Sequence, residues 1–382
     1  MAERAQIVII GGGIMGLSIA YNLAKNHGIK DVVVLEKSYL CSGASGRNGG
    51  GVRAQFGSES NVRLMQESLR LCREFAAEMK INVWFREGGY LFLTRSAEGQ
   101  ASLEASVAVQ NECGHPTEMW SPAEAKKLVP ELDLDGVVAA SYNPNDAVVF
   151  PWPFVWGYAR GAQSHGVRVR TFTRVIGFET RGKAITKVVT DHGAIETSRV
   201  VNAAGAWSPQ VAAMLGVELP NKPHRHEICS SEPLKPWLTP LVADLSNGLY
   251  FSQSTRGEIV GGISNHDVPE GIDMESSSKF LGLYAKALTR TVPLLGAVKV
   301  LRQWAGCYDL TPDQNPIVGQ VDEVEEFYQA SGFMGHGFMM APVMGKLLAQ
   351  HIAEGTELPL FSRWSLRRFK EGRLLREHMI IG

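Results

Sequence analysis

Three glycines near the start of the chain have the spacing G-x-G-x-x-G. Gly11, Gly13 and Gly16 directly follow an apolar run. In this pattern the first glycine permits a tight turn, the second lets the backbone approach a pyrophosphate, and the third lets a helix pack closely on a strand. The free N–H groups at the start of that helix then face the negative charge. The spacing therefore predicts a dinucleotide site, with Ile14 and Met15 beside it.

An acidic side chain stands where such a site needs one. Glu36 follows a second apolar run, residues 32–35, and lies about 20 residues after the glycines. Its carboxylate is placed to accept hydrogen bonds from a ribose hydroxyl, and an acid there disfavours a 2′-phosphate. The alternative is a glycine turn that merely packs a helix on a strand, but the strand, helix and acid in register favour a cofactor. This motif alone does not distinguish FAD from NAD.

Two later segments favour FAD. Residues 200–207 read as a strand that ends in small residues and leads into a helix, and residues 332–338 repeat this arrangement near the C-terminus. Each segment permits another close approach of the backbone to a ligand. Three glycine-rich strand ends spread over the chain suit an extended FAD molecule better than NAD.

The elements that would position these segments follow from hydrophobic periodicity. Residues 6–10 and 32–35 are predicted as buried strands with a helix at 16–26 between them, which makes a βαβ unit. Apolar spacing and capping signals predict further helices, and β-branched runs predict further strands. These helices are 58–80, 121–129, 153–164 and 277–290, and the strands are 89–93, 167–172, 185–190, 195–197, 200–203, 224–230, 249–253, 258–262 and 298–304. No repeat or linker divides the chain cleanly, so two interleaved domains are expected.

Composition narrows the class of protein. The 382 residues are 45% hydrophobic and 20% charged, with 38 Lys plus Arg against 39 Asp plus Glu. This balance gives no electrostatic argument for a nucleic-acid partner or an anionic membrane. No apolar run approaches the roughly 20 residues of a membrane-spanning helix, and the N-terminus lacks a signal-peptide pattern. Five scattered cysteines favour reduced thiols over metal ligation, so we expect a cytoplasmic protein with no metal site.

Seven motifs occur in an order that carries a family resemblance. They are the first glycine turn with Glu36, the loop 42–50, and the segments 88–91, 202–207, 304–306, 311–313 and 332–339. Together they resemble the glycine-oxidase and sarcosine-oxidase branch of the D-amino-acid-oxidase superfamily. The similarity is greatest to the FAD-carrying β subunits of heteromeric sarcosine oxidase and L-proline dehydrogenase.

The resemblance implies a fold and a cofactor. The fold is α/β plus antiparallel β: a glutathione-reductase-type, Rossmann-like FAD-binding domain with an interleaved antiparallel-sheet substrate domain. The FAD domain would comprise residues 1–85, 145–220 and 305–382, and the substrate domain residues 86–144 and 221–304. The FAD would be non-covalent, because the positions of the family's attaching cysteine and histidine fall at Gly306 and near Pro151. Cys307 is then expected to be a packed thiol.

The resemblance also assigns site residues. Arg53 would hold the carboxylate of the substrate as a bidentate fork, Tyr250 and Tyr308 would line the substrate pocket, and His336 would contact the flavin. Backbone N–H groups of residues 335–339 would stabilise charge that develops on the flavin ring. From the residues alone, a solvated Arg53, tyrosines that only pack and a structural His336 are the alternatives. The other residues expected at the cofactor are Lys37, Ser42, Ser45, Arg47, Asn48, Gly49, Gly50, Val175, Ala203, Ala204, Gly205, Trp207, Gly306, Gly335, Gly337, Phe338 and Met339.

The implied reaction removes a hydride from the carbon next to nitrogen in a small amino acid or N-alkyl amino acid, leaving an imine. The lysine that assists oxygen reduction in monomeric oxidases falls near Ile259, so a dehydrogenase is favoured. A lysine of the C-terminal motif is replaced by Met339, so binding of the carboxylate would depend on Arg53 or on other groups that the sequence does not identify. One alternative is a glycine or sarcosine oxidase that uses O2 directly. Another is a chain that passes electrons to a second, α-type subunit or other acceptor, which leaves open an FMN at the interface. A binding protein without redox chemistry is disfavoured by the intact glycine motif.

Overall fold

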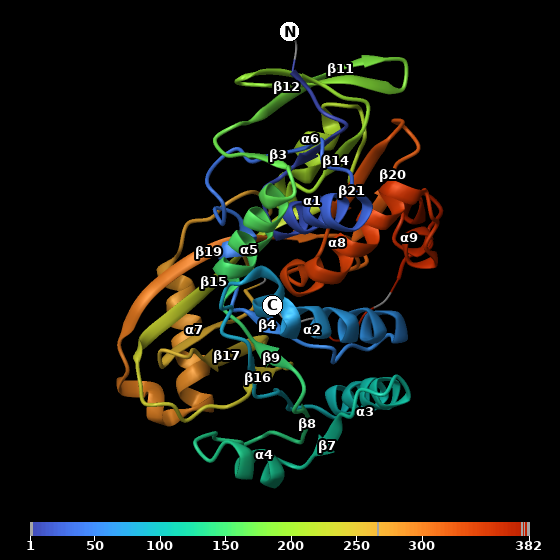
Figure 1. Ribbon diagram of the computed structural model, residues 1–382. Helices are drawn as coiled ribbons and strands as arrows, with labels where there is room; N and C mark the ends of the chain where they lie inside the picture. Colours follow the sequence, from blue (N-terminus) through green and yellow to red (C-terminus); the bar gives the residue numbers. More distant parts are fainter. Residues whose placement is uncertain (1–2, 266, 376, 378, 380–382) are drawn as a thin grey trace.

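The computed structural model describes residues 3–265, 267–375, 377 and 379. Its central sheet has six strands in the order β10, β3, β2, β14, β21 and β20. Figure 1 labels β3, β14, β21 and β20 among them. Neighbouring strands are parallel except for β20, which runs antiparallel to β21. The strands are β2 (Ile7–Ile10), β3 (Val32–Leu35), β10 (Arg168–Arg170), β14 (Val200–Asn202), β20 (Ile317–Gln320) and β21 (Phe327–Ser331). Since β2, β14 and β21 are parallel, their carboxyl ends meet at one edge, where the three glycine-rich segments begin.

Both faces of the central sheet are covered, because alternate residues of each strand point to opposite sides. Ile7 and Ile9 belong to a core that four helices complete: α1 (Ile14–His27), α2 (Glu59–Met79), α5 (Pro151–Ser164) and α8 (Gly337–Glu354). Val8 and Ile10 belong to a second core on the other side. That core is completed by α6 (Ser208–Ala213) and by a four-stranded sheet of β1 (Glu3–Arg4), β13 (Gly193–Glu196), β12 (Ala184–Thr190) and β11 (Val175–Arg181).

A second large sheet has eight strands in the order β19, β15, β18, β17, β16, β6, β8 and β7. Its neighbours are antiparallel except for β16 and β6, which are parallel. The strands are β6 (Tyr90–Thr94), β7 (Glu118–Trp120), β8 (Ala139–Asn143), β15 (Lys222–Pro233), β16 (Leu241–Asp244), β17 (Leu249–Gln253), β18 (Glu258–Gly262) and β19 (Val300–Leu310). Helix α7 (Ser278–Thr291) packs on one face of this sheet, and α3 (Ala97–Glu112) and α4 (Pro122–Leu128) lie near its β6–β8 end (Figure 1).

Short elements join the two large sheets. Strands β4 (Gly51–Val52), β9 (Ala147–Val148) and β5 (Arg86–Glu87) form a small sheet between them. Three 3-10 turns, η1 (Ala44–Gly46), η2 (Gly205–Trp207) and η3 (Pro293–Ala297), and the helices α9 (Pro359–Arg363) and α10 (Arg367–Lys370) complete the described elements. A fully buried ion pair holds α10 against the 311–315 loop, with Arg368 Nε 2.7 Å from Asp313 Oδ2.

The predicted architecture is confirmed, and most elements lie where the sequence placed them. Helix α4 begins with the predicted capping box, in which Ser121 and Glu124 bond each other's backbone. The periodicity did not predict α3 or β11, and β19 extends to Leu310 where the strand was expected to end at 304. The predicted domain boundaries stay a prediction. None of the helices in the described part of the chain is long and apolar enough to span a bilayer.

Candidate active site

A cavity of about 500 Å³ lies at the carboxyl edge of the central sheet and reaches the long strands β15 and β19. This volume is within the range of small-molecule sites. Every residue predicted at the cofactor or the substrate lines the cavity, with the exception of Gly16. A Cβ on Gly16 would overlap the carbonyl oxygen of Gly11, so this glycine serves the contact of helix and strand.

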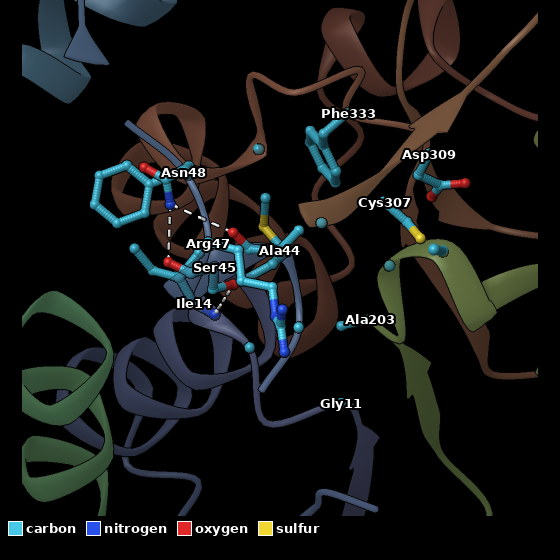
Figure 2. Close-up of a pocket in the computed structure, with 18 of the residues that line it drawn as sticks. Gly11, Ile14, Ala44, Ser45, Arg47, Asn48, Ala203, Cys307, Asp309 and Phe333 are labelled. Carbon is cyan, nitrogen blue, oxygen red and sulfur yellow. Dashed lines mark hydrogen bonds between the residues drawn. The ribbon is translucent and has the colours of Figure 1, made fainter. Parts of the chain in front are cut away.

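The first glycine turn leaves one position open to a ligand. Gly11 has φ +112°, and a Cβ there would overlap the carbonyl of Ala203. A Cβ on Gly13 would meet only the hydroxyl of Ser45, at 3.0 Å. Figure 2 shows this hydroxyl accepting a hydrogen bond from the first N–H of α1, at Ile14, over 3.0 Å. The turn therefore combines a bare backbone with the N-terminus of a buried helix, which suits a phosphate.

One end of the cavity is polar and lies at the end of β3. The Glu36 carboxylate accepts hydrogen bonds from the N–H groups of Gly12, at 3.0 Å, and Ser38, at 2.9 Å. Lys37 Nζ lies 3.2 Å from the centroid of the Trp207 ring. Burial lowers the pKa of this amine to about 8. The carboxylate, the ammonium and the indole provide groups that a ribose and an adenine can contact.

The loop 42–50 forms one wall and is held by its own polar groups (Figure 2). Asn48 Nδ2 donates to the carbonyl oxygens of Ala44 and Ser45, and its Oδ1 accepts from Gly50. Arg47 donates to two further carbonyls: its Nε to residue 42 and its Nη1 to residue 305, each over 2.8 Å. Its guanidinium therefore ties the loop to β19. Contact of Arg47 with cofactor phosphates stays a prediction.

Arg53 lines the cavity and is buried, with 1% of its surface exposed. It donates to the carbonyls of Gln55 and Met379 and lies 3.2 Å from His336 Nε2. The guanidinium also lies 4.1 Å from the centre of the Phe56 ring. Each of these hydrogen-bond partners is neutral, because burial and the neighbouring guanidinium hold the pKa of His336 well below its usual value.

The contact with Arg53 fixes the tautomer of His336. A guanidinium carries donors only, so Nε2 of His336 accepts and the proton of the neutral ring sits on Nδ1. His336 is the residue that precedes α8, and the preceding turn is tight, since Gly335 has φ +80°. His336 thus offers one N–H donor beside the N-terminus of a buried helix.

A polar wall from three strands faces these residues. Tyr250 on β17 and Tyr308 on β19 line the cavity, and His226 on β15 lies between their strands. His226 Nε2 is 3.0 Å from the Tyr250 hydroxyl. The His226 ring stacks on Tyr308 with 4.5 Å between centroids and on Tyr250 with 5.7 Å. Burial raises the pKa values of both phenols, so both are protonated donors.

Sequence reasoning missed several lining residues, among them His226, Tyr90 and Asp309. Asp309 (Figure 2) accepts hydrogen bonds from Gly332 N, at 2.6 Å, and Asn221 Nδ2, at 3.0 Å. Burial raises the pKa of this carboxyl to about 6. It sits next to Tyr308 in the sequence, which was the one available signal. His226 had none, since a lone histidine in a strand is usually structural.

The structure also shows where the residues that bear on covalent flavin attachment and on oxygen reduction lie. Cys307 lines the cavity, and its thiol lies 3.2 Å from the carbonyl oxygen of Asp273. Burial raises its pKa, so it is a protonated, packed thiol. Ile259 is buried in the core beneath α7 and does not line the cavity. Among the described lining residues the only lysine is Lys37.

Comparison with known proteins agrees with this geometry. The sequence pattern of the FAD-dependent oxidoreductase family matches residues 6–351. The chain is 31% identical to the β subunit of sarcosine oxidase from Rhodobacter capsulatus, over 100% of this chain and 92% of that one. L-proline dehydrogenase from P. horikoshii is 37% identical, with a TM-score of 0.91 over 98% of this chain and 100% of that one. Glycine oxidase from Geobacillus kaustophilus is 25% identical, with a TM-score of 0.86 over 95% and 98%. The chain therefore belongs to the family of FAD-dependent oxidoreductases and is of the sarcosine oxidase, glycine oxidase and proline dehydrogenase type.

Proposed function

We propose that this chain oxidises the C–N bond of a small amino acid with a free carboxylate, with secondary amines preferred, to an imine. We propose further that it acts as a dehydrogenase, passing electrons to an acceptor other than O2. Bound FAD would supply the hydride acceptor. The roles below are those of the chain's own residues in binding and orienting the substrate.

The cavity fits FAD at three places. Gly13 presents bare backbone at the start of α1, and Glu36 offers carboxylate oxygens at the end of β3. At the far end, the start of α8 aims free N–H groups toward the cavity, next to His336. These N–H groups would stabilise negative charge on the flavin ring, as preorganised dipoles do in oxyanion sites.

The observation that carries the substrate class is the buried charge of Arg53, which contacts no carboxylate in the part of the chain that the structure describes. Burial lowers the pKa of Arg53, and the carboxylates of Asp146 and Glu377 counter this only through space. Each makes its own bonds elsewhere: Asp146 accepts from Ala54 N, at 2.8 Å, and Glu377 accepts from Gly57 N, at 2.8 Å. A buried charge without a contacting partner is costly. A substrate carboxylate in the adjoining cavity would offset that cost, with the Tyr250 and Tyr308 hydroxyls as further donors.

The preference for a dehydrogenase rests on the lining residues. No lysine other than Lys37 lines the described cavity, and Lys37 lies over the ring of Trp207. A cation beside the reduced flavin favours transfer of electrons to oxygen, because it stabilises the negative charge that oxygen acquires. The family resemblance assigns this role to a lysine whose position here is Ile259, and Ile259 does not line the cavity, which supports a different acceptor.

The test is anaerobic absorbance of the yellow holoenzyme during titration with sarcosine, glycine, L-proline and N,N-dimethylglycine. Sarcosine methyl ester and L-prolinamide, which lack the carboxylate, are matched controls. We expect at least one amino acid to bleach the flavin, its control to fail, and reoxidation to be fast with a dye and slow with air. Equal rates with dye and air would reject the dehydrogenase, and bleaching by the ester or amide would reject the carboxylate requirement.

Arg53 variants sharpen this test. We expect Arg53→Met to weaken binding of the amino acid that bleaches wild type about 10-fold or more, since a charge-assisted hydrogen bond contributes about 1.5–3 kcal/mol. Arg53→Lys keeps the charge and should lose less. Arg63→Met, at an exposed position on α2, is the control and should behave as wild type. Equal losses in the lysine and methionine variants would argue against a role for the charge.

We also propose that the chain works with a second, α-type subunit, and that an FMN lies at their interface. Support comes from the sarcosine oxidase β subunits among its relatives and from exposed aromatic side chains around Pro151. Phe150 is 47% exposed, Trp156 is 42% exposed, and Trp84 packs edge-on against Phe150. Exposed aromatic residues are enriched at protein interfaces. Co-purification of a second polypeptide in equal amount, with two flavins per pair, would support this; a single chain that is fully active with its acceptor would reject it.

A further inference from the structure

His226 is a polar side chain of the cavity wall to which the proposed function gives no role. It is 6% exposed and comes from the middle of β15, where it pairs with Gly306 of β19. Its Nε2 meets the Tyr250 hydroxyl at 3.0 Å, and its ring lies 10° from parallel with that of Tyr308. The histidine therefore touches both tyrosines of the substrate end.

The geometry leaves Tyr250 little freedom to move away. A Cβ added to Gly262 would lie 2.8 Å from the Tyr250 hydroxyl, and one added to Gly49 would lie 3.4 Å from the ring. On the other side, a Cβ on Gly335 would be 2.6 Å from Cζ of Tyr308. Glycines thus let the backbone pack directly against both rings, and the hydroxyl of Tyr250 stays beside His226.

His226 is neutral at physiological pH, because burial, and then the neighbouring His224, lower its pKa to about 4. A neutral imidazole has one N–H donor and one acceptor nitrogen. If Tyr250 donates to Nε2, its only proton is used and none is left for a ligand. If Nε2–H donates to the Tyr250 oxygen, the phenol proton is left either for the neighbouring Tyr308 hydroxyl, with which Tyr250 is hydrogen-bonded, or for a ligand in the cavity.

We propose that His226 is a positioning residue: its Nε2–H donates to the Tyr250 oxygen and thereby directs the Tyr250 proton to the substrate carboxylate. This rests on the proposed function, since a carboxylate, which only accepts, selects the arrangement in which Tyr250 donates. Such a chain of hydrogen bonds strengthens its last member, because each donor is polarised by the one behind it. Arg53 and Tyr250 would then bind the carboxylate from two sides.

The experiment measures binding of unreactive carboxylates to the holoenzyme through the change in flavin absorbance. The probes are methoxyacetate and tetrahydro-2-furoate, which replace the amine of sarcosine and proline by oxygen. Their neutral controls are 2-methoxyethanol and tetrahydrofurfuryl alcohol. The variants are His226→Phe, His226→Gln, Tyr250→Phe and the double variant His226→Phe/Tyr250→Phe.

We expect His226→Phe and Tyr250→Phe each to raise the Kd of the carboxylate that binds wild type about 10-fold, which corresponds to about 1.4 kcal/mol. The double variant should be no worse than either single one, because both break the same chain. His226→Gln, whose amide N–H can reach the place of Nε2–H, should stay within about 3-fold of wild type, and the alcohols should bind all variants alike. Wild-type affinity in His226→Phe, or losses that multiply in the double variant, would overturn the proposal.

Further variants and measurements distinguish a positioning role of His226 from a folding defect, from failure of the proposed function and from a catalytic role. His226→Asn has the same amide on a shorter side chain, so it should lose the affinity that His226→Gln keeps; equal affinities would contradict the proposal even if His226→Phe does not fold. Failure of the proposed function looks different: wild type would then bind neither carboxylate and bleach with no amino acid. A His226 catalytic base is a third outcome, seen if His226→Gln keeps Kd but slows bleaching by the amino acid, and it too would overturn the positioning role.

Discussion

Gly335 has a left-handed backbone conformation and packs directly against Tyr308 of the site. Its replacement by alanine therefore tests how tightly this part of the site is packed. The residue has φ +80°, and an added Cβ would lie 2.6 Å from Cζ of Tyr308 and 2.9 Å from each Cε. The ring of His226, stacked on Tyr308 with 4.5 Å between centroids, blocks one direction of retreat. Gly335→Ala must therefore displace the turn before α8, the tyrosine, or both.

The magnitude has two parts. A left-handed conformation costs a non-glycine residue about 1–2 kcal/mol, and forcing a methyl into a packed site costs about 1–3 kcal/mol. Gly355 is a matched control for the first part: it has φ +66° at the C-terminal end of the same helix, and nothing lies within 4 Å of its added Cβ. Gly355→Ala should lose only the conformational part, and Gly335→Ala should lose about 2–5 kcal/mol in all.

The assays are urea unfolding for stability and flavin fluorescence for FAD affinity. We expect Gly355→Ala to bind FAD as wild type does, and Gly335→Ala to bind FAD and carboxylate probes more weakly. The contact of the new methyl group with Tyr308 in Gly335→Ala disturbs the site, whereas the unfavourable φ in Gly355→Ala lies outside it. If both variants lose the same stability and both bind FAD normally, Tyr308 is free to move and the packing argument is wrong.

Three other outcomes follow from the structure. Gly13→Ala should leave the free energy of unfolding of the FAD-free chain unchanged, because its Cβ meets only the Ser45 hydroxyl. It should weaken FAD binding about 10-fold or more, because the methyl group blocks the approach of a phosphate. Equal FAD affinity of the variant and wild type in a titration would refute this. Asp313→Asn should cost about 3–5 kcal/mol in urea unfolding, because it leaves Arg368 buried without its charge partner; a loss below 1 kcal/mol would mean that water reaches the pair. The pKa of His226 is lowered to about 4 in the folded chain, so on acidification the unfolded chain takes up a proton at this residue first. The contribution of neutral His226 to stability is therefore complete above pH 6.5. It falls by up to about 1.4 kcal/mol per pH unit as the pH drops toward 4. The difference in free energy of unfolding between wild type and His226→Gln, measured from pH 6.5 to pH 4, isolates the contribution of His226. A difference that does not change with pH would contradict the expectation.

The cofactor half of the site could be predicted from sequence because it depends on local backbone chemistry. Gly11 and Gly13 stand at fixed spacing between a strand and a helix, and no long-range contact is needed to give them meaning. The same holds for Glu36 at the next strand end and for Gly335 before α8. Each residue is next to the element that positions it, so reading the element places the residue.

The substrate half could not be predicted to the same depth. His226 faces the cavity only because β15 pairs with β19 in a register that sets it opposite Gly306. A shift of one residue in that pairing would turn His226 away from the cavity. The sequence of either strand does not specify this register, so only the family resemblance pointed to Tyr250 and Tyr308, and nothing pointed to His226.

Arg53 shows the limit of recognising a residue without its surroundings. The sequence identified the side chain and its expected ligand, but its charge has meaning only through contacts that join distant parts of the chain. Gln55 is a neighbour, His336 precedes the last long helix, and Met379 lies close to the C-terminus. All three are neutral, so among the described residues the guanidinium is not half of an ion pair, and this is why we propose it as the receptor for a substrate carboxylate. Had Asp146 or Glu377 touched Arg53 instead of bonding Ala54 and Gly57, the same arginine in the same motif would have been a structural residue.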